Sequence, residues 1–216
     1  MRRIIVCEFA PERGSAFMNW LPGSRVVRRY LGETVPESFD VLMLGGGPMS
    51  ANEEDRARHP FIQEEFDRVR ALASDPAAPM LVGICLGAQL IVLALGGDVV
   101  RGETVRGWNE IRQLADHRMF PLCTRYVQFE FHSNHIVRLP PGARLLADSP
   151  RDAVEAFAVG DRILATAYHP EIGPADAERI YRGAGLAPSE LHNDRFPDPG
   201  PAAAFASRFF FDAITA

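Results

Sequence analysis

A cysteine set between two glycines is the first candidate for chemistry in this sequence. In Gly83-x-Cys85-x-Gly87 it follows a short apolar run at Met80–Ile84, which predicts a buried strand, and it precedes a longer apolar run typical of a buried helix. A strand that turns directly into a helix needs small residues at the bend and presents the side chain at its tip. Because the helix N-terminus favours negative charge, we expect a lowered pKa for the Cys85 thiol and a role as nucleophile.

A cysteine nucleophile needs a base, and His169 is the candidate among the six histidines. It follows a strand-like run at Ile163–Ala167 and has an acid two positions on, in His169-Pro170-Glu171. Residues i and i+2 of an extended segment point the same way, so Glu171 can orient the His169 ring. The other interpretation is that this tripeptide is a polar loop without a catalytic role.

A run of glycines, Gly45–Pro48, offers backbone N–H groups for a negatively charged oxygen. It follows a buried strand predicted over Phe39–Leu44, and open α/β sheets bind ligands at the carboxyl ends of their parallel strands. We expect Gly47, together with Leu86 at the helix start, to form an oxyanion hole. The alternative is an ordinary turn between a strand and a helix.

The elements that must position these residues alternate along the first half of the chain. Strand and helix in succession predict a parallel sheet with helices on its faces. After residue 97, short alternating segments separated by turns predict antiparallel or mixed strands. The predicted strands are Ile4–Phe9, Arg25–Leu31, Phe39–Leu44, Met80–Ile84, Asp98–Arg101, Val105–Leu114, Tyr126–Phe131, Ala143–Ala147, Ala153–Val159 and Arg162–Ala167, and the predicted helices outside the cysteine motif are Glu53–Ser74, Ala175–Gly183 and Pro201–Ile214.

The composition of the chain argues against several classes of protein. A chain of 216 residues with 47% hydrophobic and 24% charged residues can bury a full core, and we expect one domain over residues 1–216. The net charge of −5 argues against a nucleic-acid partner. Cys7, Cys85 and Cys123 lack metal-ligand spacing, which argues against a disulfide framework or a zinc site. Without a signal peptide or a long apolar stretch, we expect a cytoplasmic protein with no membrane contact.

In combination, order and spacing these motifs resemble the class I (triad-type) glutamine amidotransferase domain. The cysteine motif Gly83–Gln89 is preceded by Leu44–Pro48 and is followed, 84 residues after the cysteine, by His-Pro-Glu. The similarity extends roughly from Ile4 to Ile172 and is greatest to stand-alone proteins related to the amidotransferase half of GMP synthetase. It implies a flavodoxin-like open, mostly parallel central sheet with helices on both faces, a nucleophile elbow and a small antiparallel extension.

The resemblance also implies an activity. The cysteine would attack the side-chain amide of glutamine, and hydrolysis of the resulting thioester would give glutamate, with ammonia released to an acceptor on a partner such as a synthetase. No cofactor and no metal ion are implied. The implied residues are Cys85, His169 and Glu171 as the triad, Gly47 and Leu86 as the oxyanion hole, and Gln89 as a substrate contact.

One segment departs from the family pattern. Where the family often has Ser-His-Gly-Asp before Leu-Pro, this chain has Asn134-His135 in place of Gly-Asp. That part of the family borders the glutamine pocket, so Asn134 and His135 are candidate substrate-binding residues. The alternative is that His132 and His135 are structural or surface residues.

Two other functions therefore stay open. A hydrolase of γ-glutamyl amides or peptides would use the same triad, and both the altered segment and the lack of a fused synthetase allow it. A non-catalytic regulatory relative is the other possibility, against which the intact triad argues.

Overall fold

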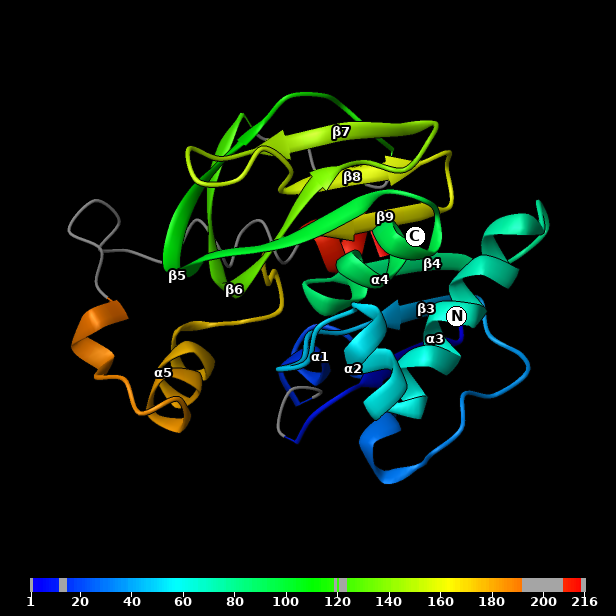
Figure 1. Cartoon of the computed structure of the whole chain (residues 1–216), viewed down its shortest axis with the longest axis horizontal. Helices are drawn as coiled ribbons and strands as arrows, with labels where there is room; N and C mark the ends of the chain where they lie inside the picture. Colours follow the sequence, from blue (N-terminus) through cyan, green and yellow to red (C-terminus); the bar gives the residue numbers. More distant parts are fainter. Residues whose placement is uncertain (1, 12–14, 119, 121–123, 192–207, 215–216) are drawn as a thin grey trace.

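The computed structural model describes residues 2–11, 15–118, 120, 124–191 and 208–214 of the chain. Its centre is a nine-stranded mixed sheet in the order β2-β1-β3-β4-β9-β8-β7-β5-β6 (Figure 1). The strands are β1 (Ile4–Glu8), β2 (Arg25–Arg28), β3 (Val41–Leu44), β4 (Met80–Ile84), β5 (Asp98–Gln113), β6 (Arg125–Arg138), β7 (Ala143–Asp148), β8 (Ala156–Val159) and β9 (Ile163–Thr166).

The first five strands in this order form a parallel half. All four neighbouring pairs from β2 to β9 are parallel, which confirms the flavodoxin-like strand order in this part of the sheet. Helices cover both faces, as expected: α3 (Pro60–Ser74) and α4 (Leu86–Ala94) pack on one, and α1 (Ser15–Met18) and a π-helical turn, η3 (Phe209–Ile214), pack on the other. Because β3, β4 and β9 are parallel neighbours, the segments that follow them all leave the sheet at the carboxyl ends of its strands.

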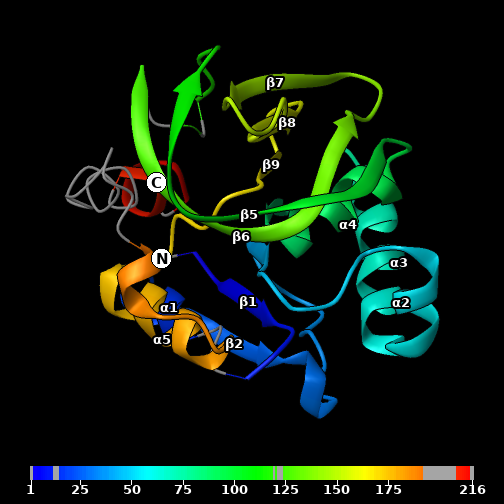
Figure 2. The same ribbon diagram turned by 60° about the vertical axis from the view of Figure 1, so that its left-hand side comes forward.

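The antiparallel half is larger than the sequence predicts. The pairs β9-β8, β8-β7, β7-β5 and β5-β6 are all antiparallel, and the long β5–β6 ribbon curves strongly (Figure 2). The sequence predicts a mostly parallel sheet with a small antiparallel extension. This prediction is wrong about the relative sizes of the two parts, because most paired residues belong to antiparallel pairs. Two predicted strands merge into β5 because a register irregularity between Arg101 and Val105 carries the pairing across the intervening turn.

Local chemistry explains the other differences in the elements. The helix predicted over Glu53–Ser74 is two helices, α2 (Glu53–Arg58) and α3, because Pro60 cannot continue a helix but is well suited to begin one. The strand predicted over Arg25–Leu31 ends at Arg28 and continues as a 3₁₀ turn, η1 (Arg29–Leu31). The chain also forms α5 (Pro174–Gly183) and a second 3₁₀ turn, η2 (Pro188–Leu191).

Several smaller expectations can be placed on the structure. Of the predicted last helix, Phe209, Phe210 and Ile214 are buried, whereas residues 201–207 lie outside the described residues. Cys7 is buried in β1, and Cys123 lies outside the described residues. None of the helices formed by the described residues is long and apolar enough to cross a bilayer.

Candidate active site

Cys85 stands at a strained bend between β4 and α4. Its φ of 52° and ψ of −105° make it the one non-glycine residue with positive φ among the described residues. A Cβ built on Gly83 would lie 2.7 Å from the Gly87 carbonyl, and one built on Gly87 would lie 2.1 Å from the carbonyl oxygen of Leu44. Because no side chain fits at either position, the two glycines allow β3, β4 and α4 to pack this closely. Strain of this kind concentrates at functional sites and costs about 1–3 kcal/mol.

The thiol of Cys85 is buried and electrostatically activated. Its backbone N–H donates to the carbonyl of Thr166 on β9 at 2.8 Å, which fixes the bend to the neighbouring strand. Burial alone would raise the pKa of the Cys85 thiol, but the charge and hydrogen bond of His169, with a smaller effect from His132, lower it below its usual value. These contacts favour a thiolate at Cys85.

His169 lies in the segment after β9 and is held from two directions. Its Nδ1 lies 2.7 Å from Oε1 of the buried Glu171, and its backbone N–H donates to the Phe129 carbonyl on β6 at 2.8 Å. Burial alone would lower the pKa of His169, but the charges of Glu171 and Cys85 and the hydrogen bonds with both raise it to about 10. The geometry is therefore that of a thiolate–imidazolium pair with a carboxylate orienting the ring.

The glycine loop after β3 contributes a further residue, Gly46, for which the sequence alone predicts no role. A Cβ built on Gly46 would lie 2.5 Å from Cε1 of His169, so the ring occupies the space that any other residue at position 46 would fill. The Gly45–Pro48 run was the available signal, because several adjacent glycines often mark a close approach of the backbone. Gly46 therefore leaves the space that the His169 ring occupies.

The two residues expected to supply the oxyanion hole, Gly47 and Leu86, lie close together. A Cβ built on Gly47 would lie 3.0 Å from Cδ2 of Leu86, so the loop after β3 touches the first residue of α4. Within the described part of the chain, neither the Gly47 N–H nor the Leu86 N–H donates to another backbone group. Both amides are therefore available to a ligand.

A cavity of about 320 Å³ opens beside the thiol. Its lining residues are Gly47, Pro48, Cys85, Thr104, Phe131, His132, Ser133 and His169. This cavity brings together residues from the glycine loop, the elbow, the β5–β6 ribbon and the segment after β9. Phe131, His132 and Ser133 belong to β6, so the antiparallel ribbon forms one wall of the site.

Three candidate substrate-binding residues lie elsewhere. Gln89 is buried in α4, where its N–H donates to the Cys85 carbonyl at 3.0 Å and its side-chain oxygen has no hydrogen-bond partner among the described residues. His135 contacts Asp152 at 2.5 Å rather than the cavity. Asn134 lines a second cavity of about 300 Å³.

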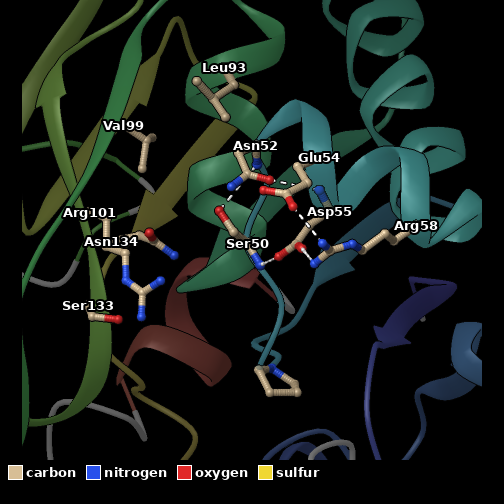
Figure 3. Close-up of a pocket in the computed structure, with 11 residues that line it drawn as sticks. Ser50, Asn52, Glu54, Asp55, Arg58, Leu93, Val99, Arg101, Ser133 and Asn134 are labelled. Atoms are coloured by element: carbon tan, nitrogen blue, oxygen red, sulfur yellow. Dashed lines mark hydrogen bonds and ion pairs between the residues drawn. The ribbon is translucent and has the colours of Figure 1, made fainter.

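This second cavity adjoins the first. Pro48 and Ser133 line both. Its other walls come from the start of α2, with Ser50, Asn52 and Asp55, and from the opposite side, where Arg101 and Asn134 face across the space (Figure 3). Polar groups of both charges therefore surround an open space next to the thiol-bearing cavity.

Comparison with known proteins agrees with this geometry. The family model described as glutamine amidotransferase class-I matches residues 25–182. The glutamine-hydrolyzing GMP synthase of Thermotoga petrophila is 32% identical over 133 residues, which cover 62% of this chain and 24% of that enzyme. One subunit of the glutamine-hydrolyzing GMP synthase of Sulfolobus acidocaldarius is 33% identical over 140 residues, covering 63% of this chain and 69% of that subunit. A glutamine amidotransferase of Methylobacillus flagellatus shares the fold, with a TM-score of 0.83, 20% identity and coverage of 100% of this chain and 95% of that one.

Proposed function

Because the chain belongs to the class I glutamine amidotransferase family, we propose that it hydrolyses the side-chain amide of glutamine through Cys85. The pairing of a lowered thiol pKa with an imidazole held by Glu171 is the observation that carries this proposal. A thiolate is the reactive form of cysteine, and His169 holds the proton that a leaving amine must receive.

The proposed reaction has two halves. The Cys85 thiolate attacks the amide carbon, and the N–H groups of Gly47 and Leu86 stabilise the negative oxygen, each worth about 10²–10³ in rate by analogy with other oxyanion holes. His169 gives its proton to the amide nitrogen, and ammonia leaves behind a glutamyl thioester. Neutral His169 then takes a proton from water, the hydroxide attacks the thioester, and Cys85 departs as thiolate with glutamate released.

The direct test measures glutamate release from glutamine by purified protein. We expect turnover in the parent chain and none in Cys85→Ser, with the fold retained. Cys7→Ala is the matched control, since Cys7 is the other described thiol and lies buried in β1, where burial raises the pKa of its thiol. Full turnover in Cys85→Ser would refute the proposed nucleophile. A parent Cys85 that resists a glutamine-analogue electrophile would favour the non-catalytic alternative.

The second cavity favours one alternative substrate class. Ammonia needs no room beyond the thiol, whereas the amine of a γ-glutamyl amide or peptide does, and the adjoining space shares Pro48 and Ser133 with the Cys85 cavity. A panel of γ-glutamyl amides separates the two functions. Values of kcat/KM above that for glutamine would identify a γ-glutamyl hydrolase, and Cys85→Ser would abolish either activity.

The destination of the ammonia is a separate proposal. The similarity to a protein named as one subunit of a GMP synthase supports an acceptor site on a synthetase partner. Pull-down with the full chain, followed by a test for glutamine-dependent amination by the captured protein, examines this proposal. A pull-down that captures no protein with glutamine-dependent amination activity, while the purified chain still hydrolyses glutamine, would leave the hydrolysis proposal intact and refute the partnership.

A further inference from the structure

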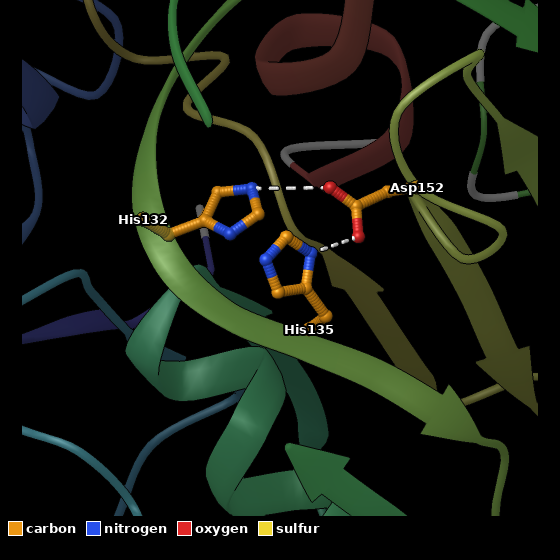
Figure 4. Close-up of side chains that lie close together, drawn as sticks. All are labelled: His132, His135 and Asp152. Atoms are coloured by element: carbon orange, nitrogen blue, oxygen red, sulfur yellow. Dashed lines mark hydrogen bonds and ion pairs between the residues drawn. The ribbon is translucent and has the colours of Figure 1, made fainter. Parts of the chain in front are cut away.

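A cluster of imidazoles and carboxylates lies beside the Cys85 cavity. His132 and His135 on β6 both turn toward Asp152, which lies between β7 and β8 (Figure 4). Nδ1 of His135 is 2.5 Å from Oδ1 of Asp152, and Nε2 of His132 is 3.8 Å from Oδ2. Glu130 and Glu155 complete the group, with their carboxylate oxygens and one from Asp152 within 4.8 Å of one another.

The ring nitrogens of both histidines face only acceptors in these contacts. In His132, Nδ1 lies 3.1 Å from the carbonyl oxygen of Asn134 while Nε2 lies 3.3 Å from Oε1 of Glu130. In His135, Nε2 lies 2.8 Å from the carbonyl oxygen of Glu103 while Nδ1 faces Asp152. Two acceptors on one ring are satisfied either by an imidazolium, which donates from both nitrogens, or by a neutral imidazole that donates from one nitrogen and binds a metal ion with the other.

In the described part of the chain, no arginine forms an ion pair with any of the three carboxyl groups. Glu130 and Glu155 are fully buried and Asp152 is 5% exposed, and their ion pairs among the described residues are with His132 and His135. Oδ2 of Asp152 has no hydrogen-bond partner within the described residues, and Glu155 interacts with Glu130 and Ser149. Buried charges of one sign are costly unless a partner, a proton or a metal ion neutralises them.

We propose that His132, His135 and Asp152 bind one divalent transition-metal ion. The two imidazoles favour zinc and its neighbours over magnesium or calcium. Ligand atoms about 2.1 Å from a tetrahedral zinc ion lie roughly 3.4 Å apart. The separation of 3.8 Å between His132 Nε2 and Asp152 Oδ2 fits this spacing with a small adjustment. Asp152 would bind through Oδ2, because its Oδ1 lies only 2.5 Å from His135 Nδ1.

The outer contacts of the two histidines match those of metal ligands. A metal-bound histidine commonly donates its other N–H to a carbonyl, which fixes the ring and its tautomer. The carbonyls of Asn134 and Glu103 stand at these places. The ion would join β6 to the segment before β8, and through His132 it would fix the wall of the Cys85 cavity.

The test uses the full chain carrying Cys85→Ser, because the catalytic thiol could itself bind zinc. After removal of metal with a chelator, Zn²⁺ is titrated by calorimetry and Co²⁺ by its visible d–d absorption. We expect one ion per chain and a rise in the unfolding temperature on zinc binding. Asp152→Asn and His135→Gln should each weaken binding by at least about tenfold, a loss seen even for outer-shell partners of metal sites.

Asp148→Asn is the matched control, because Asp148 lies at the end of β7 and pairs with Arg112 outside the cluster. With Asp148→Asn added, the Cys85→Ser chain should bind zinc as it does without that change. Absence of uptake by the parent would refute the proposal and assign the neutralisation to protons, one of them shared by Glu130 and Glu155. Uptake that both cluster variants retain would place the ion elsewhere and refute it equally. If a variant fails to fold, absence of Co²⁺ uptake by the Cys85→Ser chain still refutes the proposal, and none of these readouts depends on glutaminase activity.

Discussion

Replacement of Gly46 by alanine isolates the positioning of the base from the chemistry of the triad. The added methyl carbon would lie 2.5 Å from Cε1 of His169, whereas non-bonded carbon atoms approach to about 3.5–4.0 Å. The ring or the glycine loop must therefore move by about 1 Å. A misplacement of that size costs about 10²-fold in rate, so we expect kcat/KM for glutamine to fall about 100-fold in Gly46→Ala.

Two measurements show whether the cause is a displaced imidazole. The first is glutamate release, and the second is the alkylation rate of Cys85 by iodoacetamide as a function of pH. A displaced His169 lowers the thiol pKa less while burial still raises it, so the alkylation profile should shift to higher pH. Gly183→Ala is the control, because a Cβ at Gly183 meets no atom within 4 Å. Wild-type kcat/KM in a folded Gly46→Ala protein would refute the reasoning.

Three other substitutions test the thiol, the elbow and a buried ion pair. His169→Ala removes the charge that lowers the pKa of Cys85, so alkylation near neutral pH should slow and recover only at higher pH; an unchanged profile would contradict the proposed pair. Gly87→Ala places a carbon 2.1 Å from a backbone oxygen of β3 and should lower the free energy of unfolding in urea by about 3 kcal/mol. Arg29→Met removes one of two arginine partners of the buried Glu65, the other being Arg68 at 2.8 Å, so it should cost less than the about 3–5 kcal/mol of a fully unpaired buried charge. Adding Glu65→Leu should restore most of that loss, and failure to do so would argue against an electrostatic cause.

The parallel half of the sheet and the closeness of Cys85 to His169 could be predicted from sequence because their signals are local. A buried apolar run followed by glycine identifies a strand and the turn at its carboxyl end, as at Leu44 and at Cys85. Parallel pairing then brings such ends to one edge, which is how residues 85 and 169 could be associated across 84 positions.

The contacts that sequence could not predict depend on irregular pairing and on the approach of loops. Residues three apart in an ideal strand point to opposite faces, so the spacing of His132 and His135 gives no reason to expect a shared neighbour. The register irregularity between Arg101 and Val105 lies opposite this segment, where both rings reach Asp152. The size of the antiparallel half was missed for the same reason, since irregular pairing hides the continuity of β5.

The backbone hydrogen bond from Cys85 to Thr166 has a consequence for engineering this protein. It joins the nucleophile to β9, three residues before the base, so the distance between thiol and imidazole depends on the register of two central strands. The side chains of Phe131 and Ser133 belong instead to the ribbon and take no part in that register. Libraries at these two wall positions would change the lining of the cavity without altering the β4–β9 register, whereas Phe129 and His132 of the same ribbon contact or influence the pair and should be left unchanged.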